Sequence, residues 1–208
     1  MSQESERKPE AKLSTQDFDR EFRAQVAEMT GGLAPSAFAS AWADWAMQLS
    51  VSPARQAELR QHLLQRTQDT WAFALKALSG MPLSPSEGFD GPPDRRFEAA
   101  DWSRFPFNLY ARAYRNNAAV LAEAVQDVGG VADYNAQLVG FAVRMVLDAS
   151  SPSNVLATNP ELLALTQSEQ GQNLVRGVQH MLEDMRRSVQ GMEPVGSEDF
   201  EVGKTVAV

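Results

Sequence analysis

The sequence predicts a mainly α-helical protein with one short β-strand at its C-terminus. From about residue 17 to residue 190, apolar side chains recur every three or four positions, in segments that end at Gly or Pro. This spacing is typical of helices that bury one face. In the last nine residues, FEVGKTVAV at 200–208, the apolar period changes to two, which is the pattern of a strand.

The composition limits the classes of protein to which the chain can belong. With 208 residues, 43% of them hydrophobic, the chain is long enough for one domain with a core, or one domain plus a tail. A net charge of −8 argues against a nucleic-acid-binding surface. No apolar run is long enough to span a membrane, and the polar N-terminus is not a secretory signal. With no Cys, thiol nucleophiles and disulfides are excluded, and we expect a cytoplasmic protein.

Pro, Gly and charge divide the chain into five parts. We expect a disordered tail at 1–15 and a helical lead-in at 16–80. A linker rich in Pro and Gly follows at 81–96. The second helical region occupies 97–195, and the strand region occupies 196–208.

The lead-in contains three expected helices. The first carries a stripe of Phe18, Phe22, Val26 and Met29, and it either docks on the body or binds a partner as an amphipathic segment. The second opens at Pro35, and Trp42 and Trp45 on its face serve either core packing or a partner.

The third helix of the lead-in is expected from Pro53 to about Ser79, with Ser52 as its N-cap. Its predicted inward face consists of Leu59, Leu63, Thr67, Trp71, Ala74 and Leu78. His62 on this helix is interpreted as a surface or interfacial residue, because no second ligand stands at metal-binding spacing.

The second helical region begins with an aromatic-dense segment at 97–110, which we interpret as a loop fixed onto the body. A helix is expected from Pro106 to Gly129. The next one, at 132–149, has apolar residues on nearly all sides and is predicted to be the most buried. Arg144 and Asp148 on it form a charge pair or lie at its polar edge.

The segment SPSNVLATNPELL at 151–163 predicts a structured corner between two helices. Pro152 ends the preceding helix, and Val155 with its two neighbours is expected to be an apolar plug. Asn159 is the expected N-cap of the following helix, and Glu161 complements the dipole of its first turn. Helices on either side of Gly171 complete the region, and His180 on the second is interpreted as packed or solvated.

The sequence contains no recognisable set of catalytic or ligand-binding residues. A serine nucleophile needs a base and an orienting group, but no Gly-x-Ser-x-Gly stretch is present and neither His62 nor His180 has a convincing partner. We therefore predict no catalytic, cofactor-binding or metal-ligating residues. The final strand has no pairing partner elsewhere in the sequence, so we expect the rest of its sheet to lie beyond residue 208. The alternatives are that it frays or pairs with a second chain.

Four segments carry a resemblance to a known family: DRRFEAADWSRFPFNLYARAY, SPSNVLATNPELL, GQNLVRGVQHMLEDM and FEVGKTVAV. They resemble, in the same order, segments of class I polyhydroxyalkanoate synthases, the poly-beta-hydroxybutyrate polymerases. The resemblance is strong over residues 90–208 and general over 17–80.

The resemblance implies a helical N-terminal region followed by an α/β-hydrolase domain that uses a Cys-His-Asp triad to polymerise (R)-3-hydroxyacyl-coenzyme A. This chain lacks the lipase-like box and any Cys, so no catalytic residue is carried over and the chain is predicted to be inactive alone. The resemblance implies roles in stabilising the catalytic domain or a dimer, in contacts with phasin-type proteins and in attachment to polymer granules. The alternatives are a stand-alone phasin-like granule protein and, least favoured, an independent enzyme.

Overall fold

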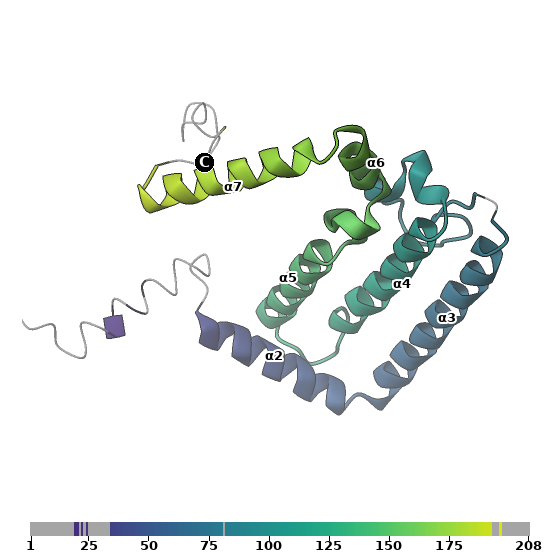
Figure 1. The fold of residues 1–208 in the computed structure, drawn as a ribbon. Helices are drawn as coiled ribbons and strands as arrows, with labels where there is room; N and C mark the ends of the chain where they lie inside the picture. Colours follow the sequence, from purple (N-terminus) through teal and green to yellow (C-terminus); the bar gives the residue numbers. More distant parts are fainter. Residues whose placement is uncertain are drawn as a thin grey trace, which may run out of the picture. The chain divides into compact units, whose positions relative to one another are not determined.

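The computed structural model describes residues 19, 20, 22, 24, 34–80, 82–192 and 196. Within them it contains six α-helices, four short 3-10 helices and no strand (Figure 1). The mainly helical fold class is therefore confirmed for this part of the chain. The predicted tail, most of the predicted helix at 18–29 and the predicted strand at 200–208 lie outside the described residues.

Contacts divide the chain into two compact units. The first comprises Met1–Arg66 and Asn117–Asp148, and the second comprises Thr67–Asn116 and Ala149–Val208. Helices α3 (Pro53–Ala77) and α4 (Phe107–Val125) contribute residues to both units. The domain boundaries that composition suggested stay predictions.

The core of the first unit forms where three helices meet. Helix α2 (Pro35–Ser50) begins at Pro35, as predicted, and its Ala41 is fully buried. Ala41 clusters with Val125 of α4 and with Leu138 and Val139 of α5 (Asp133–Ala149), and Trp45 is among the half-buried side chains around them. The Trp45 indole N–H donates to the Ala124 carbonyl at 2.9 Å, so this tryptophan serves the core.

Helix α2 also holds the start of α5. The Asp44 carboxylate accepts hydrogen bonds from the Asn135 side chain at 2.7 Å and from the Ala132 backbone N–H at 3.1 Å. The Asn135 bond is the main cause, and the Ala132 bond the next, of a pKa of Asp44 below its ordinary value. A carboxylate supplied by another element thus satisfies a donor at the helix N-terminus.

The prediction that α5 is the most buried helix is wrong. Only Leu138 and Val139 of α5 are buried, whereas Tyr134, Phe141 and Val146 are each more than half exposed. One side of the helix packs on Ala41 and Val125, with Val143 beside them. The exposed apolar side chains have no covering element among the described residues. Arg144 and Asp148 are both exposed, on the polar edge.

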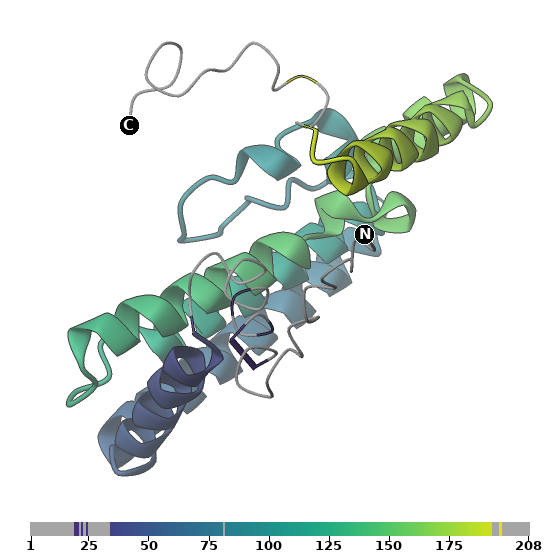
Figure 2. The same cartoon turned by 90° about the vertical axis from the view of Figure 1, so that its left-hand side faces the viewer.

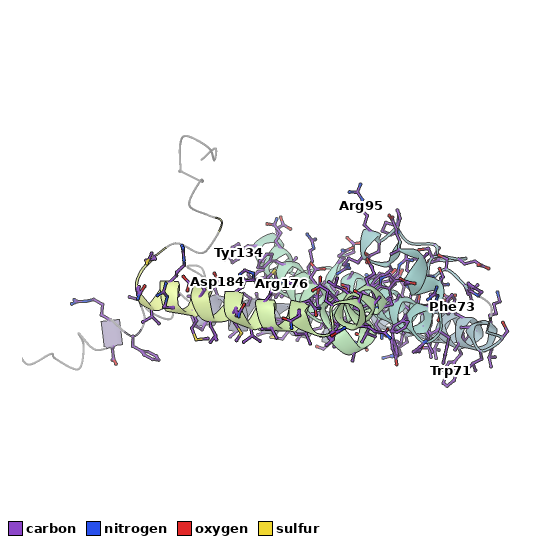
Figure 3. The ribbon with its side chains drawn as sticks, turned by 45° about the horizontal axis from the view of Figure 1, so that its top comes forward. Trp71, Phe73, Arg95, Tyr134, Arg176 and Asp184 are labelled. Carbon is purple, nitrogen blue, oxygen red and sulfur yellow. The ribbon has the colours of Figure 1, made fainter. Side chains whose placement is uncertain are left out.

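The predicted inward face of α3 is also wrong, although the predicted extent of the helix is confirmed. Phe73 and Ala77 are the buried residues, while Trp71 is 68% exposed and points away from the helix (Figure 3). The Ser52 hydroxyl donates back to the Gln48 carbonyl at 2.7 Å. The inward face carries polar side chains, among them Asp69, and apolar periodicity therefore does not mark it.

The second unit has its core in the aromatic-dense segment. Phe97 of η1 (Arg95–Phe97) and Trp102 of η2 (Ala100–Ser103) pack edge to face, with ring centroids 4.8 Å apart. Both belong to one buried cluster with Ala111 of α4, and Phe107 and Tyr114 pack against this cluster. The interpretation of this segment as a loop fixed onto the body is confirmed.

Two short 3-10 turns, η3 (Pro152–Asn154) and η4 (Leu156–Thr158), form the predicted corner before α6 (Pro160–Ser168). The apolar plug is wrong: Val155 is 49% exposed, and the buried residues of the corner are Ser151, Asn159 and Pro160. The polar residues are buried because they bond to the backbone of the corner.

A tight reversal connects α6 to α7 (Gln172–Val189), and the two helices contact each other (Figures 1 and 2). The Gly171 N–H donates to the Thr166 carbonyl at 2.8 Å, and the Gln170 N–H donates to the Gln167 carbonyl at 3.3 Å. This pair of bonds is a Schellman motif. Gln170 and Gly171 both have positive φ, at 52° and 84°. Among the described residues, no helix has the length and apolar character that crossing a bilayer requires.

Candidate functional site

In the second unit, Arg112 on α4 makes five hydrogen bonds although it is only 2% exposed. Its guanidinium donates twice to the Asp69 carboxylate, at 2.7 and 2.5 Å. It also donates to three backbone carbonyls, those of Pro85 (3.1 Å), Glu87 (3.0 Å) and Gly88 (3.4 Å). All five N–H donors of an arginine are therefore used within the fold.

The Asp69 carboxylate has a second partner on α4. The Asn116 side-chain amide donates to Asp69 at 2.7 Å and to the Thr70 hydroxyl at 2.8 Å. The Asn116 side chain is buried, like that of Arg112. Asp69 thus joins α3 to two consecutive turns of α4, an arrangement that leaves the carboxylate engaged rather than available as a base.

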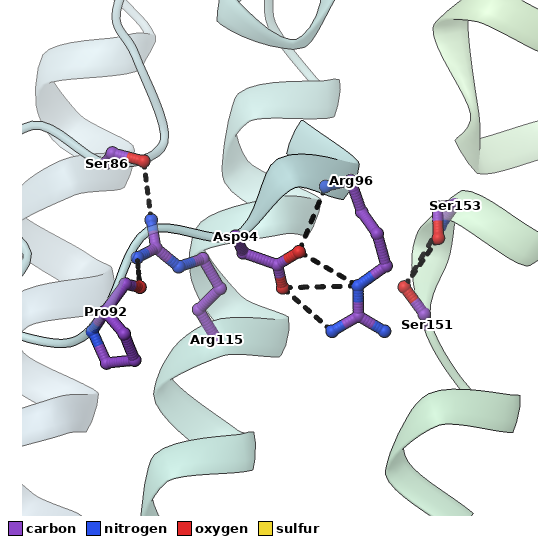
Figure 4. A network of polar contacts seen from close by, with 7 residues as sticks. All are labelled: Ser86, Pro92, Asp94, Arg96, Arg115, Ser151 and Ser153. Atoms are coloured by element: carbon purple, nitrogen blue, oxygen red, sulfur yellow. Dashed lines mark hydrogen bonds and ion pairs between the residues drawn. The ribbon is translucent and has the colours of Figure 1, made fainter. Parts of the chain in front are cut away.

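Arg115, one turn further along α4, holds the same irregular segment. It donates to the Ser86 hydroxyl at 2.7 Å and to the Pro92 carbonyl at 2.8 Å (Figure 4). Its guanidinium lies 3.9 Å from the centre of the Phe89 ring, a favourable cation–π distance. Burial is the main cause of a pKa of Arg115 below the ordinary arginine value.

Asp94 and Arg96 form a bidentate pair at the start of η1. Arg96 donates from Nε to Oδ1 at 3.0 Å and from Nη2 to Oδ2 at 2.8 Å, and its backbone N–H donates to Oδ1 at 3.1 Å (Figure 4). Burial acts to raise the pKa of Asp94, but the bonds from Arg96 outweigh it, and the pKa lies below its ordinary value. The same pair raises the pKa of Arg96.

These residues form what we call the arginine cluster: Asp69, Asp94, Arg96, Arg112, Arg115 and Asn116. A hollow of about 140 Å³ opens beside it and is lined by Phe73, Lys76 and Leu83 together with Arg112. This volume is below the several hundred Å³ of ordinary small-molecule sites. The cluster can fasten residues 82–96 to α3 and α4, but its donors and carboxylates are already committed to one another.

The corner joins the aromatic core through Trp102. The fully buried indole donates from Nε1 to the Glu161 carboxylate at 2.8 Å. The Asn159 side-chain oxygen accepts from the backbone N–H groups of Glu161 and Leu162, at 2.9 and 3.1 Å. The Asn159 amide donates to the Ser153 carbonyl at 2.7 Å. The predicted N-cap is confirmed, and Glu161 has the additional role of binding Trp102.

Neither histidine is a member of the arginine cluster. His62 Nδ1 lies 2.8 Å from a carboxylate oxygen of Glu123, a residue 61 positions away in the sequence. Both side chains are partly exposed, which agrees with the interfacial interpretation of His62. His180 is exposed on α7. Within the part of the chain that the structure describes, no three His, Asp or Glu side chains gather as a metal site would require.

Sequence reasoning missed the arginine cluster, although one signal for it was present. Polar residues recur on α4 at positions 108, 112, 115 and 116, which is helical spacing. Their face adjoins that of Phe107, Ala111 and Tyr114, which pack in the aromatic core. A polar stripe next to the apolar face of a helix indicates buried, bonded polar groups rather than solvent contact.

The chain belongs to the family of poly-beta-hydroxybutyrate polymerase N-terminal regions. A family model of the polymerase (PhaC) N-terminus matches residues 93–208, more than half of the chain, and a second model of the polymerase N-terminal region matches residues 14–55.

Three relatives show the extent of the similarity. Poly(3-hydroxyalkanoate) polymerase of Methylorubrum extorquens is 34% identical over 160 residues, and the PhaC subunits of Cupriavidus necator and Rhizobium meliloti are 31% and 30% identical over 161 and 159 residues. The matches cover 75–77% of this chain and 26% of each relative. The chain thus spans about a quarter of their length. No solved structure matches it.

Proposed function

We propose that this chain is the non-catalytic N-terminal region of a polyhydroxyalkanoate synthase and that its role is to support the catalytic domain. The observation that carries the proposal is that the family match includes the core of the second unit. The matched segment 93–208 contributes the aromatic core, two arginines of α4, the corner and α7. The residues at the centre of this unit hold segments of the chain together, as expected of a scaffold.

The hydrogen bonds of the arginine cluster favour a structural role for the cluster over a catalytic one. Arg112 has no free donor for a substrate, and the two carboxylates of the cluster accept bonds from its own cations and amides. A nucleophile needs an adjacent base and an orienting group. The hydroxyl of Ser151 bonds instead to that of Ser153, at 2.8 Å.

The alternative of a stand-alone granule protein is less well supported. One observation that motivated it was the pair Trp42 and Trp45, which pack edge to face with centroids 5.4 Å apart. Trp45 is half-buried and bonded to α4. Trp42, at 37% exposed, presents a small apolar area by itself. Granule attachment and dimer stabilisation remain proposals for the whole synthase.

A chimera tests the proposed function. Residues 1–208 replace the corresponding N-terminal quarter of the Cupriavidus necator polymerase, and coenzyme A release from (R)-3-hydroxybutyryl-coenzyme A is measured. We expect the chimera to release coenzyme A faster than the same polymerase without any N-terminal quarter, and we expect residues 1–208 alone to give only background. Release by residues 1–208 alone, or a chimera no faster than the shortened polymerase, would contradict the proposal.

A further inference from the structure

Helix α7 presents a continuous apolar face that the described residues leave uncovered. Its central seam is Val175, Val178, Leu182, Met185, Val189 and, just past the helix end, Met192, with spacings of three, four, three, four and three. Leu174 and Met181 widen the seam on one side. Every one of these side chains is at least 44% exposed, and no residue of α7 is buried. We call these eight residues the α7 apolar face.

The charged side chains on the opposite face of α7 pair with one another and with the end of α6. Glu183 accepts hydrogen bonds from Arg186 at 3.0 Å and from Arg187 at 3.3 Å. Arg176 pairs with Glu169, at the end of α6, and Figure 3 shows Arg176 and Asp184 on this helix. The charged groups are satisfied locally and remain in water, so a partner of α7 is expected on the apolar side alone.

We propose that the α7 apolar face docks onto the folded domain that follows the N-terminal region in poly(3-hydroxyalkanoate) polymerases. This inference rests on the proposed function and names the surface through which the support is given. The first argument is the width of the face. At 100° per residue the eight side chains span roughly 120° of the helix. A stripe this wide is typical of a helix on a globular core, whereas a two-helix coiled coil uses a narrower seam.

The area argues against a second copy of α7 as the occupant. Six half-exposed side chains on each of two helices can remove on the order of 1,000 Å² from water even if all are fully covered, which is below the roughly 1,200–2,000 Å² of stable interfaces. The seam also covers only about two and a half heptads, fewer than the three or four that a coiled coil needs.

The residue types argue against an apolar polymer or lipid surface. Helices that lie on such surfaces carry aromatic anchors and an excess of basic residues. The α7 apolar face consists of Val, Leu and Met, and the charges of the helix are three arginines against Glu183 and Asp184. A domain of the same chain binds α7 intramolecularly, and its effective concentration is set by the connection between the two. A modest apolar face without aromatic anchors is sufficient for such a neighbour.

Hydrogen exchange measured by mass spectrometry tests the inference. The amides of 175–189 are compared in residues 1–208 alone and in the chimera with the Cupriavidus necator polymerase. We expect these amides to exchange about 100-fold more slowly in the chimera, because docking suppresses local opening of the helix. Leu182→Glu in the seam should abolish the protection. Gln179→Glu, which adds the same charge on the polar side, should leave it unchanged.

Three outcomes would overturn the inference. The first is equal exchange of α7 in both proteins. The second is protection of α7 in residues 1–208 alone while that chain is monomeric, because the occupant is then a segment of this chain. The third is a dimer of residues 1–208 that Leu182→Glu dissociates, detected by light scattering, because the occupant is then a second copy. Should the chimera be insoluble, the separately expressed polymerase domain is added to residues 1–208 and the same exchange is measured.

Coenzyme A release from the same chimera separates this inference from the proposed function. An active chimera with unprotected α7 supports the function and refutes the docking surface. A protected α7 in an inactive chimera supports the docking surface and counts against the function.

Discussion

The arginine cluster makes a quantitative prediction through Arg112→Ala. The substitution removes five hydrogen bonds: two to Asp69 and one each to the carbonyls of Pro85, Glu87 and Gly88. Breaking a buried ion pair by deleting one partner costs about 3–5 kcal/mol, and each carbonyl left without a donor adds about 1 kcal/mol.

Remaining contacts reduce this sum. The Pro85 carbonyl keeps a bond from Arg115 at 3.4 Å, and Asp69 keeps the bond from Asn116. The Asp69 side chain is also 34% exposed, so water partly replaces the lost partner. We therefore expect a loss of about 3–4 kcal/mol in the free energy of unfolding. Arg112→Lys keeps the charge but not the planar fork, and its expected loss is about 2 kcal/mol.

Urea unfolding followed by far-ultraviolet circular dichroism measures these differences. The matched control is Arg104→Ala, whose side chain is 73% exposed and pairs with Asp101 at 3.3 Å. Exposed pairs contribute at most about 1 kcal/mol, so the control should lose no more than that. If Arg112→Ala and Arg104→Ala differ by less than about 1 kcal/mol, the claim that the cluster fastens residues 82–96 is wrong.

Five further substitutions test other parts of the second unit by the same unfolding assay. Trp102→Phe loses the hydrogen bond to Glu161 and should lower the free energy of unfolding by about 1–2 kcal/mol. Glu161→Gln keeps an acceptor for the indole and should lower it by less. Equal losses in the two variants would refute a contribution of this hydrogen bond to stability. Asn159→Ala removes an N-cap and should cost about 1–2 kcal/mol, and no loss would contradict the capping role. The folded pKa of Asp94 lies below its unfolded value. Its contribution to the free energy of unfolding is therefore complete above about pH 5 and is lost as the pH falls through the folded pKa. Asp94→Asn should make the free energy of unfolding less dependent on acid pH, and an unchanged pH dependence would exclude Asp94 as a cause. Gln170→Gly relieves a left-handed backbone and should stabilise by about 0.5–1 kcal/mol, so a destabilised variant would contradict the strain.

Local sequence signals predicted those features that short-range chemistry determines. Pro35, Pro53 and the Asn159-Pro160 pair placed helix starts correctly, because caps and proline geometry act within a few residues. The aromatic density near Trp102 correctly indicated a loop fixed onto the body. These features depend on residues that are close in sequence, so they can be predicted without knowing the tertiary contacts.

The features that the sequence did not predict depend on partners far away in the chain. The inward face of α3 was misassigned because it carries Asp69, which binds Arg112 and Asn116, and hydrophobic periodicity cannot represent an inward face that is polar. Helix α5 was predicted to be central because its apolar residues lie on several sides, yet Phe141 is 51% exposed. The Glu123 partner of His62 was missed for the same reason, since 61 residues separate them.

The turn at Gln170 and Gly171 joins α7 to a domain whose packing does not depend on the side chains of α7. The backbone bonds of the Schellman motif, with the Asn173 side-chain bond to Thr166 at 2.8 Å, anchor α7 at its base, and the helix beyond lends no side chain to the interior. Removal of residues 172–208 should therefore leave the melting behaviour of the remaining domain nearly intact. Substitutions on the exposed side chains of α7 can therefore change what this helix binds without destabilising the domain that precedes it.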